Sequence, residues 1–199
     1  KDIEWLAGRG YNIFGVSIPA TYRGQQDTVH GDLQLVLWEN MADPIITGRE
    51  DLGFAKLYCE LPEPNFINDQ VTCRASWDGH EFASLTLSGL APVPADALPE
   101  GHASEGTLHY KYIPKTGVPG EADVAYAALT PGDWPNVVLE QAMLADSAQL
   151  NVKQSTWEQL PTLVNIVNTL ANLSLGECRT ATLTKTHGGK DLSDQRRLT

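Results

Sequence analysis

The stretch Gly48-Arg49-Glu50-Asp51-Leu52-Gly53-Phe54-Ala55-Lys56 ends in a lysine and separates two strand-like runs of the chain. Its two glycines allow the backbone to turn tightly and to approach its neighbours closely. Phe54, Ala55 and residues 57–58 place apolar groups beside Lys56. A lysine among apolar residues can lose its proton near neutral pH, and the neutral amine attacks carbonyl carbons to form a Schiff base. Lys56 is therefore the candidate nucleophile, although the same neighbours also suit a strand-edge lysine whose stem packs on apolar surface.

Short runs bounded by Gly, Pro, Asn or Asp surround this stretch, which is typical of antiparallel sheets and not of alternating βαβ units. Residues 32–38 accumulate apolar side chains, which predicts a strand buried on both faces. Residues 71–77 and 81–87 flank Asp78-Gly79, which suits the positive φ angles of a tight hairpin, so these runs are expected to pair. Further strands are predicted at residues 107–113, 122–129, 148–153 and 178–186.

One strong helix is predicted near the C-terminus. Apolar residues follow i, i+3, i+4 spacing from Pro161 to Leu173, and Gly176 suits the end of the helix. Several of these residues are β-branched, so the helix must be held by packing against a sheet. We therefore expect a single α+β domain over residues 1–199, with largely antiparallel strands that form a barrel or two packed sheets, covered by the C-terminal helix.

The composition limits the partners and the compartment. A formal net charge of −11 argues against nucleic acid and anionic membranes, both of which require clustered basic residues. Three cysteines without CxxC spacing fit neither a disulfide framework nor a zinc site, which indicates buried free thiols in a reducing compartment. The sequence contains neither an apolar run of ~18 residues nor a secretory leader. The expected location is the cytoplasm.

The sequence also lacks the common motifs of metal and cofactor chemistry. Its five histidines are dispersed, without HExxH or a pair at helical spacing, so no metal site is expected. GxSxG, the Walker loop and GxGxxG are absent, which lowers the hydrolase, NTPase and dinucleotide interpretations. We expect no cofactor.

A resemblance to a known family joins these observations. Residues 38–40, 43–50 and 53–56 resemble the signature of the acetoacetate decarboxylase family. The segment that runs from Gly-Arg-Glu to the lysine is the specific part of this resemblance. Supporting similarity extends over most of the chain, at residues 8–12, 17–19, 108–114 and 187–192 and in the helix after Trp157.

The resemblance implies a function and a set of site residues. Enzymes of this family form a Schiff base between the lysine matching Lys56 and a β-keto acid, and the iminium group withdraws electrons as carbon dioxide departs. Acetoacetate decarboxylases are themselves an established example of a lysine activated by desolvation or by a neighbouring cation. The expected activity is therefore that of a cofactor-independent lyase which decarboxylates a small, acetoacetate-like β-keto acid. The family also implies a homo-oligomer.

Three departures from the family pattern bear on this expectation. Leu57 stands where the family's best-studied type has a second lysine, so activation of Lys56 must come from burial. Ile13 stands where a catalytic glutamate is expected, which removes a proton carrier. The chain begins at Lys1, so we expect it to lack the family's N-terminal segment, which carries an arginine for the substrate carboxylate.

The remaining candidate residues follow from the same comparison. Phe54, Leu57 and Ile13 are candidates for the wall that excludes water from the substrate pocket, and Glu4 is a candidate second carboxylate. Arg49 and Glu50 are expected to form an ion pair that shapes the turn before Lys56 and so supports the lysine without taking part in the chemistry.

Two alternatives remain open at this stage. An enamine formed from pyruvate or a related keto acid can add to an aldehyde and lose water, which defines a Schiff-base aldolase-dehydratase. The combined loss of the glutamate, the second lysine and the N-terminal arginine fits a non-catalytic binding or structural protein that retains the fold.

Overall fold

The computed structural model describes residues 4–190 and 192–199, and the chain divides into two compact units. Unit 1 comprises Lys1–Tyr58, Gly101–Asn136 and Gly189–Thr199, and unit 2 comprises Cys59–Glu100 and Val137–Gly188. Each unit is thus assembled from segments that are distant in the sequence. The assignment of residues 1–199 to a single domain stays a prediction.

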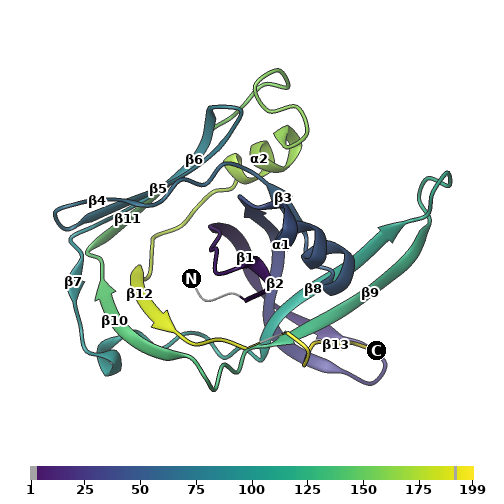
Figure 1. The fold of residues 1–199 in the computed structure, drawn as a ribbon, viewed down its shortest axis with the longest axis horizontal. Coiled ribbons are helices and arrows are strands. Elements are labelled where there is room, and N and C mark those ends of the chain that lie inside the picture. The colour runs from purple at the N-terminus through teal and green to yellow at the C-terminus, as the bar shows by residue number, and fades with distance from the viewer. Residues whose placement is uncertain (1–3, 191) are drawn as a thin grey trace. The chain divides into compact units, whose positions relative to one another are not determined.

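Unit 1 is built on one mixed sheet with the strand order β1-β2-β8-β9-β13, while β3 pairs with β2 (Figure 1). β3 and β8 both run parallel to β2, and the other pairs are antiparallel. The short helices α1 and η2 connect β2 to β3. The elements are η1 Glu4–Leu6, β1 Ile13–Arg23, β2 Thr28–Glu39, α1 Ala42–Thr47, η2 Gly48–Leu52, β3 Lys56–Tyr58, β8 Gly106–Pro114, β9 Ala122–Pro131 and β13 Arg196–Arg197.

A β-bulge in β2 determines which side chains share a face of this sheet. Ser17 pairs with Gln34 and Val16 pairs with Val36, so Leu35 is an extra residue without a partner on β1. An extra residue shifts the alternation of side chains by one position. As a result, the residues at positions 37 and 39 face the side opposite to Leu33.

The hydrophobic core of unit 1 lies on the face that carries Leu33. It contains Val29, Leu108, Leu129 and Leu198. The partly buried side chains packed against them are Ala20, Tyr22, Leu33 and Ala127. Leu33 is paired with Leu108 across β2 and β8, so His109, the next residue of β8, points to the opposite face. The bulge therefore brings Glu39 onto the face of His109.

Unit 2 contains two antiparallel sheets, with the strand orders β11-β6-β5-β4 and β12-β10-β7. Its core includes Val71, Leu87 and Leu90. Helix α2 packs near β11 and buries Val167 completely. The elements are β4 Asn65–Ile67, β5 Gln70–Trp77, β6 His80–Ser88, β7 Ala91–Pro92, η3 Ala95–Ala97, β10 Val138–Leu144, β11 Ser147–Val152, α2 Val164–Ala171 and β12 Thr182–His187.

The α+β fold expected from the sequence is confirmed, with mostly strands and two short α-helices among the described residues. Each sheet there is open, so the alternative of a closed barrel is wrong. The hairpin between β5 and β6 is confirmed, with positive φ at Asp78 (48°) and Gly79 (76°). The C-terminal helix is shorter than predicted, because its regular hydrogen bonding begins only at Val164 and ends at Ala171. Its β-branched residues have low helix propensity, which favours such early ends.

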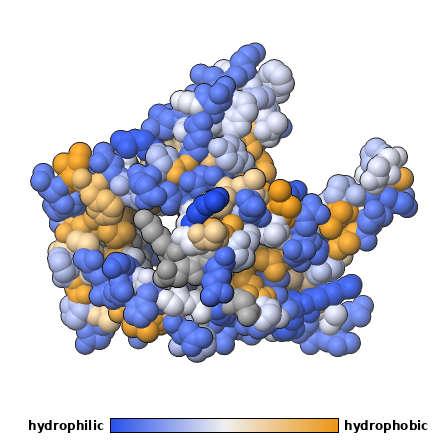
Figure 2. Space-filling model, viewed as in Figure 1, coloured by the Kyte–Doolittle hydropathy of each residue, from blue (hydrophilic) through white to orange (hydrophobic). Residues whose placement is uncertain are grey.

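Hydrophilic side chains predominate on the face of the molecule shown in Figure 2, in keeping with the net charge of −11. Apolar side chains appear there along the β8–β9 hairpin, on the right of the view. Among the residues that the structure describes, no helix is both long and apolar enough to cross a membrane.

Candidate active site

Lys56 is the first residue of β3 and lies within unit 1, where it is only 7% exposed. Two backbone interactions fix its position: it is paired with Leu37 of β2, and its carbonyl oxygen accepts a hydrogen bond from Arg49 Nη1 at 2.9 Å. The side chain runs across the buried Gly48. A Cβ atom on Gly48 would lie 2.6 Å from Lys56 Nζ, so only glycine leaves room for the lysine there.

The Lys56 ammonium group has three polar or aromatic neighbours. Nζ lies 2.7 Å from Glu39 Oε1 and donates a hydrogen bond of 3.0 Å to the carbonyl oxygen of Pro44 in α1. The Phe54 ring centroid is 5.8 Å from Nζ. The Lys56 side chain is 8% exposed and that of Glu39 is 0% exposed, so this ion pair is withdrawn from water.

Burial controls the electrostatics of the pair. Desolvation raises the pKa of the Glu39 carboxyl group above its ordinary value, and the hydrogen bond and charge of Lys56 oppose that rise. Burial, together with the negative charge of Glu39, also raises the pKa of Tyr11. The Glu39 carboxylate is consequently a stronger base than a surface carboxylate.

Strand β8 holds the turn that precedes Lys56. The His109 ring is 2% exposed and stacks on Phe54, with centroids 4.2 Å apart. Its Nδ1 lies 3.3 Å from the Gly53 carbonyl oxygen, which can only accept, so Nδ1 carries the proton. Burial lowers the pKa of His109 to about 4, and the ring is therefore neutral at physiological pH.

Two further contacts complete this support. Nε2 of His109 lies 3.1 Å from Thr130 Oγ1, to which Gln195 Nε2 donates at 2.7 Å. Lys111, also on β8, donates from Nζ to the Asp51 carbonyl oxygen at 3.0 Å. The segment that carries Gly48 and Phe54 is thus fastened to the sheet on the face where Lys56 lies.

The structure brings some of the predicted site residues together. Phe54 lies beside the ammonium group of Lys56, as described above. Arg49 contacts the Lys56 backbone, and it does so without forming the expected ion pair with Glu50, which is exposed. Their roles stay predictions.

The other predicted residues lie apart from the amine or beside its partner. Leu57 is half-buried, and strand alternation turns its side chain to the face opposite Lys56. Glu4 is exposed in η1 and is not among the groups that contact Lys56. Ile13 is paired with Glu39 across β1 and β2 and is 54% exposed. A carboxylate at position 13 would thus share a face with Glu39.

Glu39 is the residue of the candidate site that the sequence-based prediction missed. It belongs to the stretch that resembles the family, but no role was assigned to it. The available signal was an acidic residue at the end of a strand predicted to be buried, since buried carboxylates require a partner. The face on which it lies depends on the bulge at Leu35, which the apolar pattern does not reveal.

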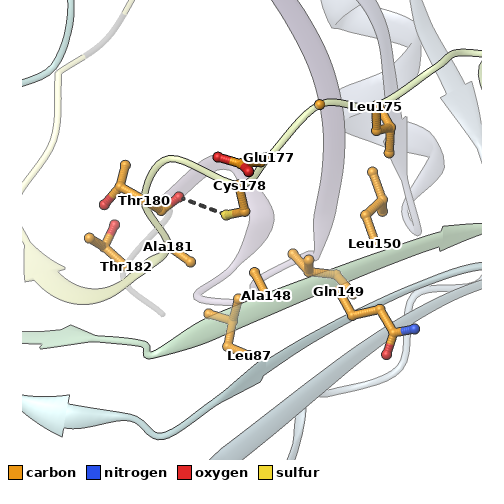
Figure 3. A pocket seen from close by; sticks show the side chains of 12 residues that line it. Leu87, Ala148, Gln149, Leu150, Leu175, Glu177, Cys178, Thr180, Ala181 and Thr182 are labelled. Atoms are coloured by element: carbon orange, nitrogen blue, oxygen red, sulfur yellow. Dashed lines mark hydrogen bonds between the residues drawn. The ribbon is translucent and has the colours of Figure 1, made fainter.

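A cavity of about 620 Å³ lies within unit 2, between β6, β11 and the segment before β12. Figure 3 shows Ala148 and Leu150 rising from the sheet toward the segment with Cys178, whose Sγ donates to the Thr180 carbonyl oxygen at 3.4 Å. Leucine and alanine side chains make up much of its lining, and no described lysine takes part. This cavity therefore offers no amine for a Schiff base.

The three cysteines are free thiols in different environments. Burial raises the pKa of Cys59 to about 12 and also raises that of Cys73. Cys178 is exposed, which differs from the expectation of three buried thiols. Among the described residues, no group of three or more His, Cys, Asp or Glu side chains is arranged to hold a metal ion.

The fold and the buried lysine–carboxylate pair place this protein in a class of α+β proteins with a candidate amine nucleophile. A profile of the family described as Acetoacetate decarboxylase (ADC) matches residues 1–188. Since this match spans most of the chain, the protein belongs to the acetoacetate decarboxylase family. No curated protein matches the sequence.

Solved structures share the fold at low sequence identity. An acetoacetate decarboxylase from Legionella pneumophila subsp. pneumophila str. Philadelphia 1 superposes with a TM-score of 0.63 at 18% identity, over 90% of this chain and 67% of that one. An acetoacetate decarboxylase-like enzyme from Sphingomonas wittichii RW1 gives 0.55 at 15% identity, over 79% and 62%.

A third structure has a different named role. The enduracididine biosynthesis enzyme MppR, in complex with pyruvate, superposes with a TM-score of 0.54 at 13% identity, over 92% of this chain and 67% of that one. The chain therefore spans about two thirds of the length of these proteins. At such identities, the likeness shows the fold alone.

Proposed function

We propose that this protein is a cofactor-independent carbon–carbon lyase that decarboxylates a small, acetoacetate-like β-keto acid through a Schiff base on Lys56. The observation that carries the proposal is the burial of Lys56, whose side chain is 8% exposed and lies in the segment most specific to the family. A surface lysine is held as a hydrated ammonium ion, whereas a withdrawn amine with a proton acceptor beside it can act as a nucleophile.

The environment of Lys56 suits the charge changes of this reaction. An iminium ion carries its positive charge where the ammonium charge was, so the Glu39 carboxylate and the Pro44 carbonyl oxygen can stabilise both. When the carbon–carbon bond breaks, its electron pair moves toward the iminium nitrogen and carbon dioxide leaves. Exclusion of water strengthens these interactions, because it lowers the local dielectric constant.

The test is chemical trapping with the protein as it stands. Incubation with acetoacetate or with pyruvate, followed by borohydride, should add the mass of the reduced adduct to the peptide that contains Lys56. Lys190→Met serves as the matched control, since Lys190 also contacts a carboxylate and a carbonyl oxygen but is not the proposed nucleophile. Lys56→Met should give no adduct, and Lys190→Met should give the wild-type amount.

The products identify the reaction that follows imine formation. Release of carbon dioxide from acetoacetate supports the lyase, and a new carbon–carbon bond from pyruvate and an aldehyde supports the aldolase-dehydratase. Failure of the wild-type protein to trap any keto acid would leave the non-catalytic interpretation. A homo-oligomer in the cytoplasm remains part of the proposal, and sedimentation of the purified protein tests the oligomer.

A further inference from the structure

We infer that Glu39 is a catalytic residue of this protein, which takes a proton from Lys56 before the amine attacks and returns it when water leaves. This inference rests on the proposed function. It assigns to Glu39 the role of proton carrier, which the family pattern would give to a glutamate at the position of Ile13.

The geometry supports a direct transfer between the two groups. Glu39 Oε1 lies 2.7 Å from Lys56 Nζ, within the distance required of a general base. Both side chains are buried, so no bulk water competes for the proton. Desolvation makes the Glu39 carboxylate more basic, and a proton shift from nitrogen to oxygen converts a buried ion pair into a buried neutral pair.

The proton transfers balance without any reagent other than the protein and the keto acid. The Nζ–H bond of Lys56 breaks as the Oε1–H bond of Glu39 forms, which leaves an amine and a carboxylic acid. The amine lone pair attacks the ketone carbon, and a proton shift from nitrogen to oxygen gives a neutral carbinolamine. Glu39 then protonates its hydroxyl group, water departs, and an iminium ion remains beside the regenerated carboxylate.

Other titratable and charged groups lie around the pair on several elements. Tyr11, before β1, is close enough to feel the charge of Glu39. Tyr58 of β3 is paired with Glu39 and is 51% exposed. Arg49 of η2 contacts the Lys56 carbonyl oxygen, and His109 of β8 lies behind Phe54. Among the described residues, Glu39 alone forms an ion pair with Nζ.

The inference predicts a specific change in the pH profile of borohydride trapping. In the wild-type protein the Lys56–Glu39 pair must hold one transferable proton, so the trapping rate should rise and then fall with pH. The two apparent pKa values of this bell-shaped profile belong to the pair and not to either residue alone. Glu39→Gln should lower the maximal rate about a hundredfold. It should also change the pH profile of trapping from a bell shape to a single rising limb. In this variant Lys56 loses its proton to solvent, and there is no Glu39 carboxylic acid to lose its proton at high pH.

Two further variants separate this role from a structural one. Glu39→Asp keeps the carboxyl group and should keep the bell with a lower maximum. Asp194→Asn removes the carboxylate that lies 2.7 Å from Lys190, and it should leave both the rate and the shape unchanged.

The outcomes distinguish the inference from the proposed function. Wild-type trapping together with an unchanged bell in Glu39→Gln would overturn the role of Glu39 and leave the Schiff base intact. No trapping in the wild type would overturn both. Should Glu39→Gln fail to fold, as judged by its thermal transition, Glu39→Asp decides: a retained bell supports the inference, and a single limb overturns it.

Discussion

Two lysines of unit 1, Lys56 and Lys190, have almost the same set of contacts and similarly buried side chains, 8% and 11% exposed, but their carboxylate partners differ in exposure. Lys56 contacts the Glu39 carboxylate at 2.7 Å, a carbonyl oxygen at 3.0 Å and the Phe54 ring. Lys190 contacts the Asp194 carboxylate at 2.7 Å, a carbonyl oxygen at 2.8 Å and an aromatic ring at 5.4 Å. The Asp194 side chain is 43% exposed, whereas that of Glu39 is 0% exposed.

The difference lies in the exposure of the anion. At Lys190, the hydrogen bond to Asp194 is the largest influence, and the pKa of the lysine is raised. At Lys56, desolvation is the largest influence on the partner, and the pKa of Glu39 is raised. The same contacts therefore stabilise the charged form of Lys190 beside a hydrated carboxylate, whereas desolvation of Glu39 beside Lys56 raises the affinity of that carboxylate for a proton. The exposure of the partner carboxylate, and not the set of contacts, distinguishes the two lysines.

The largest expected effect is on stability when the lysine of the buried pair is removed. Lys56→Met leaves the Glu39 carboxyl group buried without a cation, which should lower the free energy of unfolding at pH 7 by about 3–5 kcal/mol. Lys190→Met should cost much less, because its carboxylate partners are already hydrated. Urea denaturation of both variants measures this difference, and equal losses would contradict the comparison.

The pH dependence of the same variant has a definite sign. The folded-state pKa of Glu39 is raised, so the protonated carboxyl group favours folding. In Lys56→Met, the free energy of unfolding should be greatest below the unfolded-state pKa, ~4.3, and should fall as pH rises through the folded-state pKa. The double variant Lys56→Met/Glu39→Gln should recover stability at pH 7, since no buried charge remains.

The next largest effect concerns His109, whose imidazole ring stacks on Phe54 beside Lys56. Burial lowers the pKa of His109 from 6.5 to about 4. Between these pH values the unfolded chain binds a proton on His109 and the folded protein does not. The wild-type protein should lose about 3 kcal/mol of stability as pH falls from 6.5 to about 4. His109→Asn should lack this component, whereas the exposed His30→Asn should retain it. Denaturation curves between pH 4 and 7 test the prediction, and identical slopes in all three proteins would refute it.

The smallest expected effect probes the space that Lys56 occupies. In Gly48→Ala the new methyl group overlaps the lysine side chain, so the side chain must leave its place beside Glu39. Overpacking of this kind typically costs about 1–3 kcal/mol, and here it should also slow borohydride trapping. Gly10→Ala is the control, since nothing lies within 4 Å of a Cβ atom there. Trapping at the wild-type rate in Gly48→Ala would show that the pair does not need this geometry.

The sequence singled out the lysine and its turn, whose site role stays a prediction, but it did not single out the carboxylate that lies beside the lysine. Gly48 and Lys56 could be singled out because residue type and spacing express their requirements directly. Glu39 could not, because its face depends on the single extra residue Leu35, and an apolar run buried on both sides carries no alternation from which a bulge is visible.

The sheets were predicted with similar limits. Strands bounded by turn residues, such as β5 and β6, were found near their observed ends. β10 was missed because its sequence, Val138-Leu-Glu-Gln-Ala-Met-Leu144, combines polar and helix-favouring residues with a register irregularity. The side-chain hydrogen bonds of Gln195 with Thr130 and His109 could not be predicted either, because long-range hydrogen bonds leave no local sequence pattern.

The discontinuous assembly of unit 1 sets the order in which the protein can mature during translation. Gln195 supports His109 through hydrogen bonds, and Leu198 fills the core with Val29 and Leu108. Lys56 emerges from the ribosome long before these residues, on the order of ten seconds earlier at typical rates of synthesis. A nascent chain that already carries Lys56 therefore lacks the hydrogen bonds that hold His109 against Phe54, and the lysine acquires its complete surroundings only near the end of synthesis.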